Sequence, residues 1–219
     1  MRNLSVESRS LTLISPSEWL LSKAHENTVF SSVPGFVLRN PIPDFDYLPK
    51  IHSDNKPLKI GFCSDKLDNP LKGLEVLTKA LATLNRDYAL KLVGRNIGNF
   101  KIPEGVSFEI HSPRSDIELA SELREMDVLV VPSIQDNSPN VIGEALMCGT
   151  KVIGSDIGGI GELMRQLQMD TFQPTNVSEL KNLLADFDPV YSKSNVINLA
   201  KEVFSYEVVA PKMMEIYHG

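Results

Sequence analysis

The sequence has little of what marks a nucleic-acid-binding, membrane or secreted protein. Its 22 basic residues are outnumbered by 28 acidic ones, which gives a net charge of −6. A chain of this charge is not suited to holding nucleic-acid phosphates or an anionic lipid surface. No apolar run approaches the roughly 18 residues that a membrane span needs, and the opening residues lack the basic start and apolar core of a signal peptide. We therefore expect a cytoplasmic protein that touches the inner face of a membrane, if at all, only through parts beyond this sequence.

Cysteine and histidine are also scarce. The two cysteines, Cys63 and Cys148, lie far apart in apolar stretches, where a free thiol usually packs as a small hydrophobic group. The four histidines are scattered, and none has a second histidine or cysteine at the spacing of metal ligands. The sequence therefore predicts no metal site and no resident cofactor.

What is present is the pattern of an α/β protein. From residue 57 onward, runs rich in β-branched residues alternate with helical periodicity, which is typical of βαβ units and a parallel sheet. The predicted strands are nearly continuous in apolar residues, as expected where helices cover both faces of a sheet. We predict strands over residues 58–63, 88–93, 106–110, 127–131 and 151–155, with a short one near Thr171. We predict helices over 72–85, 115–125, 140–148 and 160–166, and then 177–187, 192–204 and 206–217.

Residues 1–56 differ in character. A strand over residues 10–15 is predicted to lead into a helix, with Ser15 as the N-cap, Pro16 in the first turn and Glu18 completing a capping box. The segment then becomes rich in proline, at positions 34, 41, 43 and 49, which is a linker composition. One strand and one helix cannot bury a core of their own. We therefore expect this piece to be the tail of a domain whose front half is absent from the chain.

The stretch most informative about chemistry runs from residue 127 to residue 163. A buried strand leads into a polar loop, and a helix begins near Asn140, so the helix N-terminus faces the crevice beyond the strand ends, where phosphate oxygens bind well. Asp136 lies in that loop and Glu144 one turn into the helix. Two carboxylates beside a phosphate site make sense if they accept hydrogen bonds from sugar hydroxyls. The alternative is a solvated loop with one acidic residue near a helix N-terminus.

Two further motifs follow strand ends. Lys72 is predicted to begin a helix, where the helix dipole disfavours a cation unless an anionic ligand binds there. An exposed, solvated lysine is the alternative. The glycines at 158, 159 and 161 follow another strand, but they do not spell GxGxxG, so the motif gives no support for a nicotinamide cofactor.

Taken together, these motifs resemble a known family. The order and spacing of PLKG, DVLVVPS, DNSPN, GEALMCGTKVIGSD and GGIGEL resemble the carboxyl-terminal domain of retaining, GT-B-fold glycosyltransferases of family four, also called glycosyl transferases group 1. The variant of the motif in this chain, with Asp-Asn before Ser-Pro-Asn, resembles the motif of the family branch that builds bacterial surface polysaccharides. The resemblance implies a Rossmann-like, doubly wound parallel sheet over residues 57–205. It further implies a remnant of the amino-terminal acceptor domain with its linker over 1–56, and a terminal helix over 206–219 that crosses back to that domain.

The resemblance also implies roles for individual residues. The family pairs two acidic residues separated by seven others, and Asp136 and Glu144 stand at that spacing. Glu144 would hold the ribose of the nucleotide, and Asp136 would hold hydroxyls of the donor sugar, although an aspartate is one methylene shorter than the usual glutamate. Lys72 matches the lysine that binds the donor diphosphate. The arginine that usually precedes this lysine is missing, and Lys66 is the only substitute at hand.

Other positions complete the implied donor site. The phosphate or sugar would be met by the loop and helix start at Asn137, Ser138, Asn140 and Val141, and the base and ribose would be lined by Gly94 and Arg95. No nucleophile or general base is identified in this chain, which agrees with a metal-independent transfer that relies on cationic side chains and a helix dipole.

We therefore expect the donor-binding half of a hexosyltransferase-type enzyme that transfers sugar from a nucleotide-sugar donor with retention. The donor is a substrate, and no cofactor is expected. The isolated chain is expected to be inactive, and residues 1–56 and 206–219 are expected to bind the missing amino-terminal domain or to mediate self-association. The alternatives are a nucleotide-sugar epimerase of the same fold and a non-catalytic nucleotide-binding module.

Overall fold

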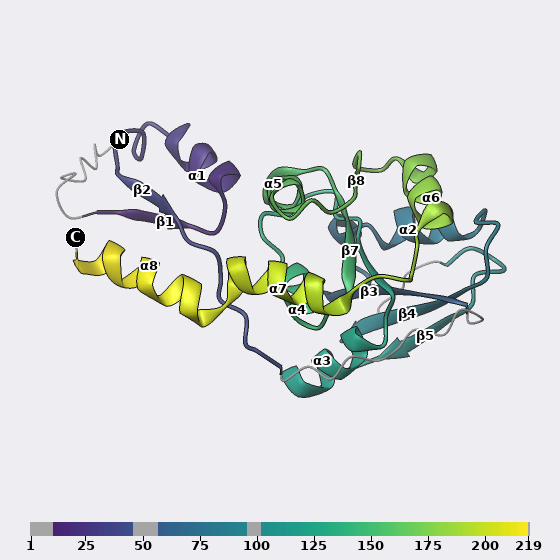
Figure 1. The fold of residues 1–219 in the computed structure, drawn as a ribbon. Helices are drawn as coiled ribbons and strands as arrows, with labels where there is room; N and C mark the ends of the chain where they lie inside the picture. Colours follow the sequence, from purple (N-terminus) through teal and green to yellow (C-terminus); the bar gives the residue numbers. More distant parts are fainter. Residues whose placement is uncertain (1–10, 46–56, 96–101, 219) are drawn as a thin grey trace.

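The centre of the molecule is a parallel sheet of six strands in the order β5-β4-β3-β6-β7-β8 (Figure 1). The computed structural model describes residues 11–45, 57–95 and 102–218. The strands are β3 (Leu58–Lys66), β4 (Tyr88–Arg95), β5 (Phe108–His111), β6 (Val128–Val131), β7 (Lys151–Ser155) and β8 (Thr171–Phe172). The chain enters the sheet in the middle, winds out to one edge, and returns to build the other. This is the doubly wound α/β fold that the sequence predicts.

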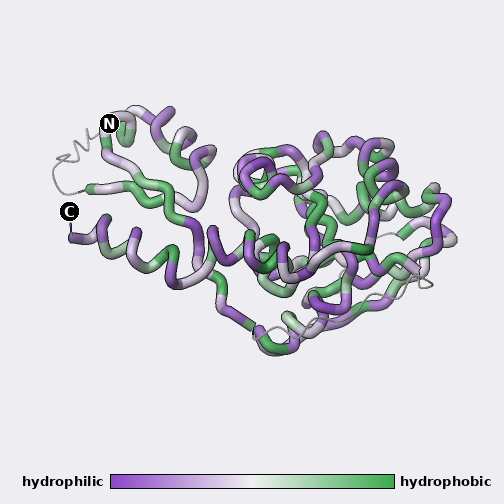
Figure 2. The backbone as a smooth tube through the Cα atoms, viewed as in Figure 1, coloured by the Kyte–Doolittle hydropathy of each residue, from purple (hydrophilic) through white to green (hydrophobic). Residues whose placement is uncertain are grey.

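Helices cover both faces of this sheet. On one face, α2 (Leu74–Leu81) and α6 (Val177–Asp186) share a core with the strands, and on the other face the core is built by α3 (Asp116–Arg124), α4 (Asn140–Met147), α5 (Gly158–Gln166) and α7 (Lys193–Phe204). Along β6, Val128 and Val130 enter the first core while Leu129 and Val131 enter the second. The middle of the sheet is accordingly rich in apolar residues (Figure 2), and β6 is apolar and buried along its whole length. Burial on both faces is the reason that this central strand shows a continuous apolar run and no alternation.

One predicted helix is divided at its start. The structure places a 3₁₀ helix, η1, over Pro70–Lys72, and α2 begins only after Gly73. Gly73 has φ of +74°, and a Cβ there would lie 1.9 Å from the carbonyl oxygen of Pro132. Only glycine fits this turn. The prediction that Lys72 begins an α-helix is therefore wrong: Lys72 ends a 3₁₀ turn, and the argument from an unfavourable helix dipole does not apply to it.

Smaller differences concern element boundaries. The strand predicted at 106–110 is observed as β5 two residues further along, and the helix predicted to reach residue 85 ends at Leu81. Both segments adjoin loops whose polar residues give no sharp stop signal. The remaining predicted helices begin and end within two residues of the observed bounds.

The amino-terminal segment is a strand–helix–strand unit. It consists of β1 (Leu13–Ser15), α1 (Glu18–His25) and β2 (Gly35–Val37), and the two strands pair in parallel. The sequence analysis missed β2, which is only three residues long and follows Pro34 in a proline-rich stretch. Residues 1–10 and 46–56, which include Pro49 and the expected domain boundary, lie outside the described residues.

The N-cap of α1 was also predicted at the wrong serine. Ser17 is the N-cap, and its side chain accepts a hydrogen bond from the Leu20 amide. Ser15 instead belongs to β1, where its carbonyl accepts a hydrogen bond of 2.8 Å from the Leu38 amide. Pairing of the strand therefore prevents Ser15 from serving as the cap, and Pro16 precedes the helix.

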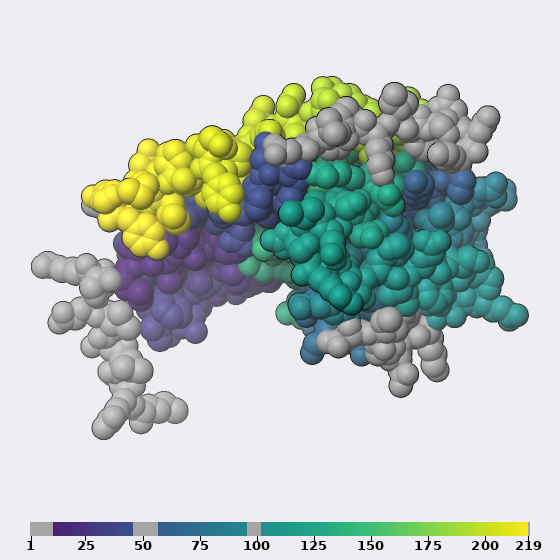
Figure 3. Space-filling model, turned by 90° about the horizontal axis from the view of Figure 1, so that it is seen from below, coloured from purple at the N-terminus to yellow at the C-terminus, as the bar shows by residue number. Residues whose placement is uncertain are grey.

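After β2 the chain runs along α7 toward the main sheet. The Ile42 amide donates to the Phe204 carbonyl at 2.8 Å, and Lys201 forms an ion pair with Asp44. The last helix, α8 (Tyr206–His218), leads from α7 back to the end of the molecule that carries β1 and β2 (Figures 1 and 3). No helix in the described ranges is long and apolar enough to cross a membrane.

This end of the molecule exposes apolar side chains on both the small sheet and α8. Ile14 on β1 is 42% exposed, Phe36 on β2 46%, and Met214 on α8 51%. Val209 on α8, which the sequence also offers as an exposed apolar residue of this end, is instead buried at 3% exposure. Parallel strands are usually covered on both faces, so a two-stranded parallel sheet with exposed apolar residues calls for a covering partner.

We predict that the 219-residue chain self-associates through this end. Replacing Phe36 and Met214 together by serine should lower the apparent mass measured by light scattering, because the substitutions remove apolar area that association would cover. The matched control is Ile117→Ser on α3, where a single apolar residue is 78% exposed away from this end. A wild-type chain that is monodisperse and monomeric would contradict the prediction.

Candidate functional site

A cavity of about 590 Å³ opens where the strand order of the main sheet reverses. Its walls come from the ends of β3 and β4, from the segments that follow β3 and β5, and from the start of α4, which follows β6. The reversal point lies between β3 and β6, the first strands of the two halves of the sheet. In open α/β sheets this is the place where ligands bind.

Seven of the ten predicted site residues line the cavity. The charged ones are Lys66, Lys72, Arg95 and Glu144, and the others are Gly94, Asn140 and Val141. The remaining three, Asp136, Asn137 and Ser138, lie in the loop before α4 and are not among the described residues that line the cavity.

Glu144 lies in the cavity wall on α4 and is largely buried. Burial raises the pKa of its carboxyl group above the ordinary value, and the nearby carboxylate of Asp116 raises it further. Cys63 lies in the same wall, and burial raises the pKa of its thiol to about 12. The thiol is therefore protonated at neutral pH, which makes Cys63 unsuited to act as a nucleophile.

The N-terminus of α4 opens into the cavity without a side-chain cap. Its N-cap residue is Pro139, which provides no capping hydrogen bond, whereas α1, α3, α6 and α7 are each capped by a serine or asparagine side chain. The first residues of α4, Asn140 and Val141, line the cavity. The positive end of the helix and its first amides thus face the space where an anion would bind.

The wall formed by β4 depends on a close backbone approach. A Cβ at Gly94 would lie 2.0 Å from the carbonyl oxygen of Ser64, so only glycine lets the ends of β3 and β4 come together there. Next to it, Arg95 forms an ion pair of 2.7 Å with Asp65, and both side chains are well exposed. Such a pair contributes little to stability and leaves the guanidinium free to exchange partners.

The sequence analysis missed the contribution of the loop after β5. Arg114 and Asp116 line the cavity at the start of α3. Ser115 caps this helix by accepting from the Glu118 amide, while the Glu118 side chain accepts from the Arg114 amide. The parallel strands all end at the same edge of the sheet. The loop after β5 could therefore have been predicted as part of the site, together with the loops after the other strands.

Lys72 has an anionic partner within the site. Its Nζ lies 2.6 Å from Oδ2 of Asp136. The same carboxylate accepts a hydrogen bond of 2.8 Å at Oδ1 from the Asn137 amide and one of 3.4 Å at Oδ2 from the Ser133 hydroxyl. Two residues that the sequence analysis assigned to different parts of a donor therefore contact each other directly.

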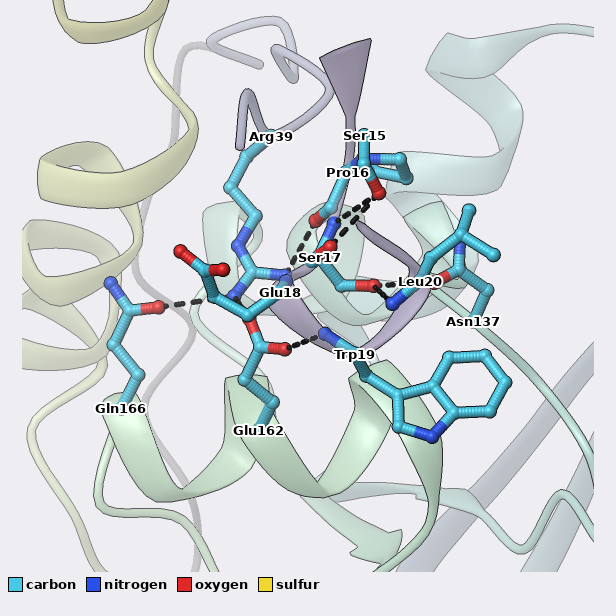
Figure 4. Close-up of polar contacts among 10 residues, drawn as sticks. All are labelled: Ser15, Pro16, Ser17, Glu18, Trp19, Leu20, Arg39, Asn137, Glu162 and Gln166. Carbon is cyan, nitrogen blue, oxygen red and sulfur yellow. Dashed lines mark hydrogen bonds and ion pairs between the residues drawn. The ribbon is translucent and has the colours of Figure 1, made fainter. Parts of the chain in front are cut away.

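The carboxylate of Glu162 on α5 binds the amino-terminal unit at three points, and Gln166 of the same helix accepts a further hydrogen bond from Arg39 (Figure 4). Glu162 accepts hydrogen bonds from the amides of Glu18 at 3.2 Å and Trp19 at 2.9 Å, and it forms an ion pair of 2.5 Å with Arg39. It thus completes the cap of α1 from a different helix. The GGIGEL motif contributes its glutamate to this junction rather than to the cavity.

The loop before α4 contacts the same junction. The Ser17 hydroxyl donates to the Asn137 side-chain oxygen at 2.5 Å while accepting from the Leu20 amide (Figure 4). A Cβ at Gly159 would lie 1.8 Å from the Asn137 carbonyl, so the glycine-rich turn is required for this packing. Asn137 is therefore part of the junction with the amino-terminal unit.

Possible metal ligands do not gather in the described ranges. Among residues 11–45, 57–95 and 102–218, no group of three His, Cys, Asp or Glu side chains is arranged to hold a metal ion.

Comparison with known proteins assigns the family. The sequence model of glycosyl transferases group 1 matches residues 57–187, which is more than half of the chain. The chain belongs to the glycosyl transferases group 1 family. The match covers the whole main sheet and the cavity.

Three similar proteins illustrate the relationship. This group 1 chain is 30% identical over 168 residues to the MMP alpha-(1→4)-mannosyltransferase of Mycolicibacterium hassiacum, which covers 68% of the chain and 40% of that protein. The sucrose-phosphate synthase of Thermosynechococcus elongatus superposes with a TM-score of 0.74 at 20% identity, over 94% of the chain and 57% of that structure. HepE of Anabaena, solved in complex with UDP-glucose, superposes with a TM-score of 0.70 at 18% identity, over 96% of the chain and 65% of that structure.

The group 1 chain is shorter than these proteins. It spans 28 to 41% of the length of the curated relatives that it matches.

We predict that Glu162→Gln loosens the amino-terminal unit of this group 1 chain. The amide would place an NH₂ group against backbone donors and would lose the charge that pairs with Arg39, at a cost of about 1 to 3 kcal/mol. Urea unfolding followed by the fluorescence of Trp19, the single tryptophan, should show an earlier transition. Glu26→Gln is the control, because its pair with Lys23 is exposed. Equal stability of the two variants would contradict the role of Glu162.

We predict that Glu144→Gln stabilises the chain at neutral pH. A carboxyl group whose pKa is raised by folding favours the folded state below its unfolded pKa, and this advantage is lost as the pH rises through the folded pKa. Glutamine stays neutral at every pH, so the variant does not lose this stability. The difference amounts to about 1.4 kcal/mol of unfolding free energy for each unit by which folding raises the pKa. Thermal unfolding should therefore show a higher midpoint than wild type at pH 7 and a similar one near pH 4. A lower midpoint at pH 7 would show that ionised Glu144 makes a stabilising contact.

Proposed function

We propose that the chain is the donor-binding half of a glycosyltransferase that transfers a hexose from a nucleotide sugar with retention of anomeric configuration. The observation that carries the proposal is the cavity at the reversal point of the sheet. Its lining combines the uncapped N-terminus of α4 with lysine and arginine side chains and with the partly buried carboxylate of Glu144. This arrangement suits a ligand with both a diphosphate and vicinal hydroxyl groups.

The diphosphate is assigned to the positive part of the cavity. The amides of Asn140 and Val141 and the Lys72 ammonium group are the donors, and Lys66 and Arg114 add positive charge at the cavity wall. Backbone amides at a helix N-terminus bind phosphate oxygens without having to desolvate a flexible side chain. Arg114 lines the same cavity, and we assign to it the positive charge that the missing arginine of the PLKG region would have given.

The nucleoside is assigned to Glu144 and the end of β4. Ionised Glu144 accepts hydrogen bonds from the ribose hydroxyls, and such charge-assisted bonds are about twice as strong as neutral ones. Gly94 and Arg95 line the cavity beside it and are assigned to the base. A diol that separates Glu144 from Asp116 would also relieve the repulsion that raises the pKa of Glu144.

The related proteins support transfer rather than epimerisation. The curated relatives carry the names of glycosyltransferases, and the HepE structure contains UDP-glucose. We assign retention and a role in bacterial surface polysaccharide synthesis from the resemblance of the motifs. The acceptor side is assigned to the part of the relatives' length that this chain does not span, with residues 11–45 and α8 as the contact to it.

We predict that the purified chain binds a nucleoside diphosphate with a dissociation constant of roughly 10 μM or weaker, because a cavity open on one side covers less than the usual 70 to 90% of a ligand. Glu144→Ala should weaken binding by about 1.5 to 3 kcal/mol. Calorimetric titration against uridine, guanosine and adenosine diphosphates measures both. Glu75→Ala, on the exposed side of α2, is the control and should bind as wild type does.

Two outcomes would contradict the proposal. Absence of binding to every nucleoside diphosphate would remove the assignment of the cavity. Multiple-turnover sugar transfer by the chain alone would show that the acceptor site does not depend on further sequence.

A further inference from the structure

The lysine assigned to the diphosphate is already paired. Lys72 Nζ lies 2.6 Å from Asp136 Oδ2, and the exposed fractions of the two side chains are 33% and 14%. A carboxylate this well shielded from water acts more strongly on a neighbouring charge than one on the surface, because the effective dielectric constant is lower. The pair is therefore a fixed part of the site rather than a passing surface contact.

The position of Asp136 is set by the loop and not by the cavity. Its carboxylate accepts from the Asn137 amide, the Ser133 hydroxyl and Lys72, which together occupy three of its roughly four acceptor positions. Ser133 is itself buried, and its carbonyl accepts a hydrogen bond of 2.6 Å from Ser155. Lys72 lines the cavity while Asp136 does not, so the lysine stands between Asp136 and the space for the ligand.

The carboxylate of Asp136 repels the released nucleoside diphosphate more strongly than it repels the nucleotide-sugar donor, because the two ligands differ in charge. In the proposed transfer, the bond between the sugar carbon and the diphosphate oxygen breaks, and the electron pair stays on that oxygen. The sugar carbon bonds to the acceptor oxygen, and the proton of that oxygen passes to the leaving diphosphate oxygen, from which it ionises into solvent. The nucleotide sugar carries about two negative charges, whereas the released nucleoside diphosphate gains a terminal phosphate with a second ionisation near pH 6 and so carries nearly three.

We propose that Asp136 is a counter-ion for Lys72 that lowers the affinity for the released nucleoside diphosphate more than the affinity for the nucleotide-sugar donor. The inference rests on the proposed function of the cavity. Asp136 is a positioning residue in this scheme, since it acts through the ammonium group that it shares with the diphosphate. The contact with sugar hydroxyls that the motif resemblance implies for Asp136 stays a separate prediction.

The test compares paired ligands on the 219-residue chain. Dissociation constants are measured by calorimetry for UDP and UDP-glucose, GDP and GDP-mannose, and ADP and ADP-glucose, and the pair that binds the wild-type chain is used with the variants. Asp136→Asn should bind the free diphosphate about tenfold more tightly and the nucleotide sugar about threefold more tightly than wild type does. Asp136→Glu, which keeps the charge, should stay within about twofold of wild type.

Two further variants separate this role from a general effect of charge or folding. Glu75→Gln removes the same charge from an exposed pair outside the cavity and should change either affinity by less than about twofold. Adding Asp136→Asn to Lys72→Met should leave the ratio of the two affinities within about twofold of that of Lys72→Met alone, because the lysine through which Asp136 acts is gone.

A second readout needs no nucleotide. Acetylation of Lys72 by acetic anhydride, quantified by mass spectrometry, should be faster in Asp136→Asn than in wild type or Asp136→Glu, because the ammonium group is no longer held. If the wild-type chain bound none of the nucleotides, the proposed function would fail, and with it the role in product release, whereas faster acetylation would still support the ion pair. Unchanged acetylation would overturn the pair itself.

The binding data can also overturn the inference while the proposed function stands. An equal change for the free diphosphate and the nucleotide sugar, or weaker binding of the free diphosphate to Asp136→Asn, would contradict a counter-ion role. Weaker binding of the nucleotide sugar alone would assign Asp136 to the sugar hydroxyls instead.

Discussion

Burial of the main sheet on both faces is the constraint on which the rest of the molecule depends. With helices on either side, the central strand β6 has no face left for polar side chains, and every one of its residues is apolar and buried. The charged groups of the cavity therefore gather at the carboxyl edge of the sheet. Arg95 is the last residue of β4, and Lys72, Arg114 and Glu144 come from the segments that follow β3, β5 and β6.

The cavity has its present shape because two of these segments are packed together. The Ile134 amide donates to the Leu71 carbonyl at 2.8 Å, and Gly73 lies directly against the carbonyl of Pro132. The turn after β3 and the loop after β6 thus form one unit, although they lie far apart in the sequence. This packing brings Lys72 within reach of Asp136, and it fixes the distance between the lysine and the N-terminus of α4.

The sequence was a good guide to what depends on local pattern. The apolar runs predicted all six strands of the main sheet, and the position of Glu144 one turn into a helix placed it at the cavity. It was a poor guide to the partners of polar groups, because these are set by contacts between distant segments. Lys72 pairs with a residue 64 positions away, and the Glu18 amide bonds to a carboxylate 144 positions away. No local signal distinguishes Glu162, which caps another helix, from Glu144, which faces the cavity.

The segment between β2 and the main sheet has a consequence for movement of the amino-terminal unit. Ile42 and Asp44 are tied to Phe204 and Lys201 on α7, so this part of the connection moves with the main sheet. The stretch before them is also held, because Arg39 pairs with Glu162 on α5 and the side-chain amide of Asn40 donates to the side-chain oxygen of Asn140 on α4 at 2.8 Å. In the other connection, Ser205 alone separates α7 from α8. Rotation of the amino-terminal unit against the main sheet would therefore have to break polar contacts to both α4 and α5.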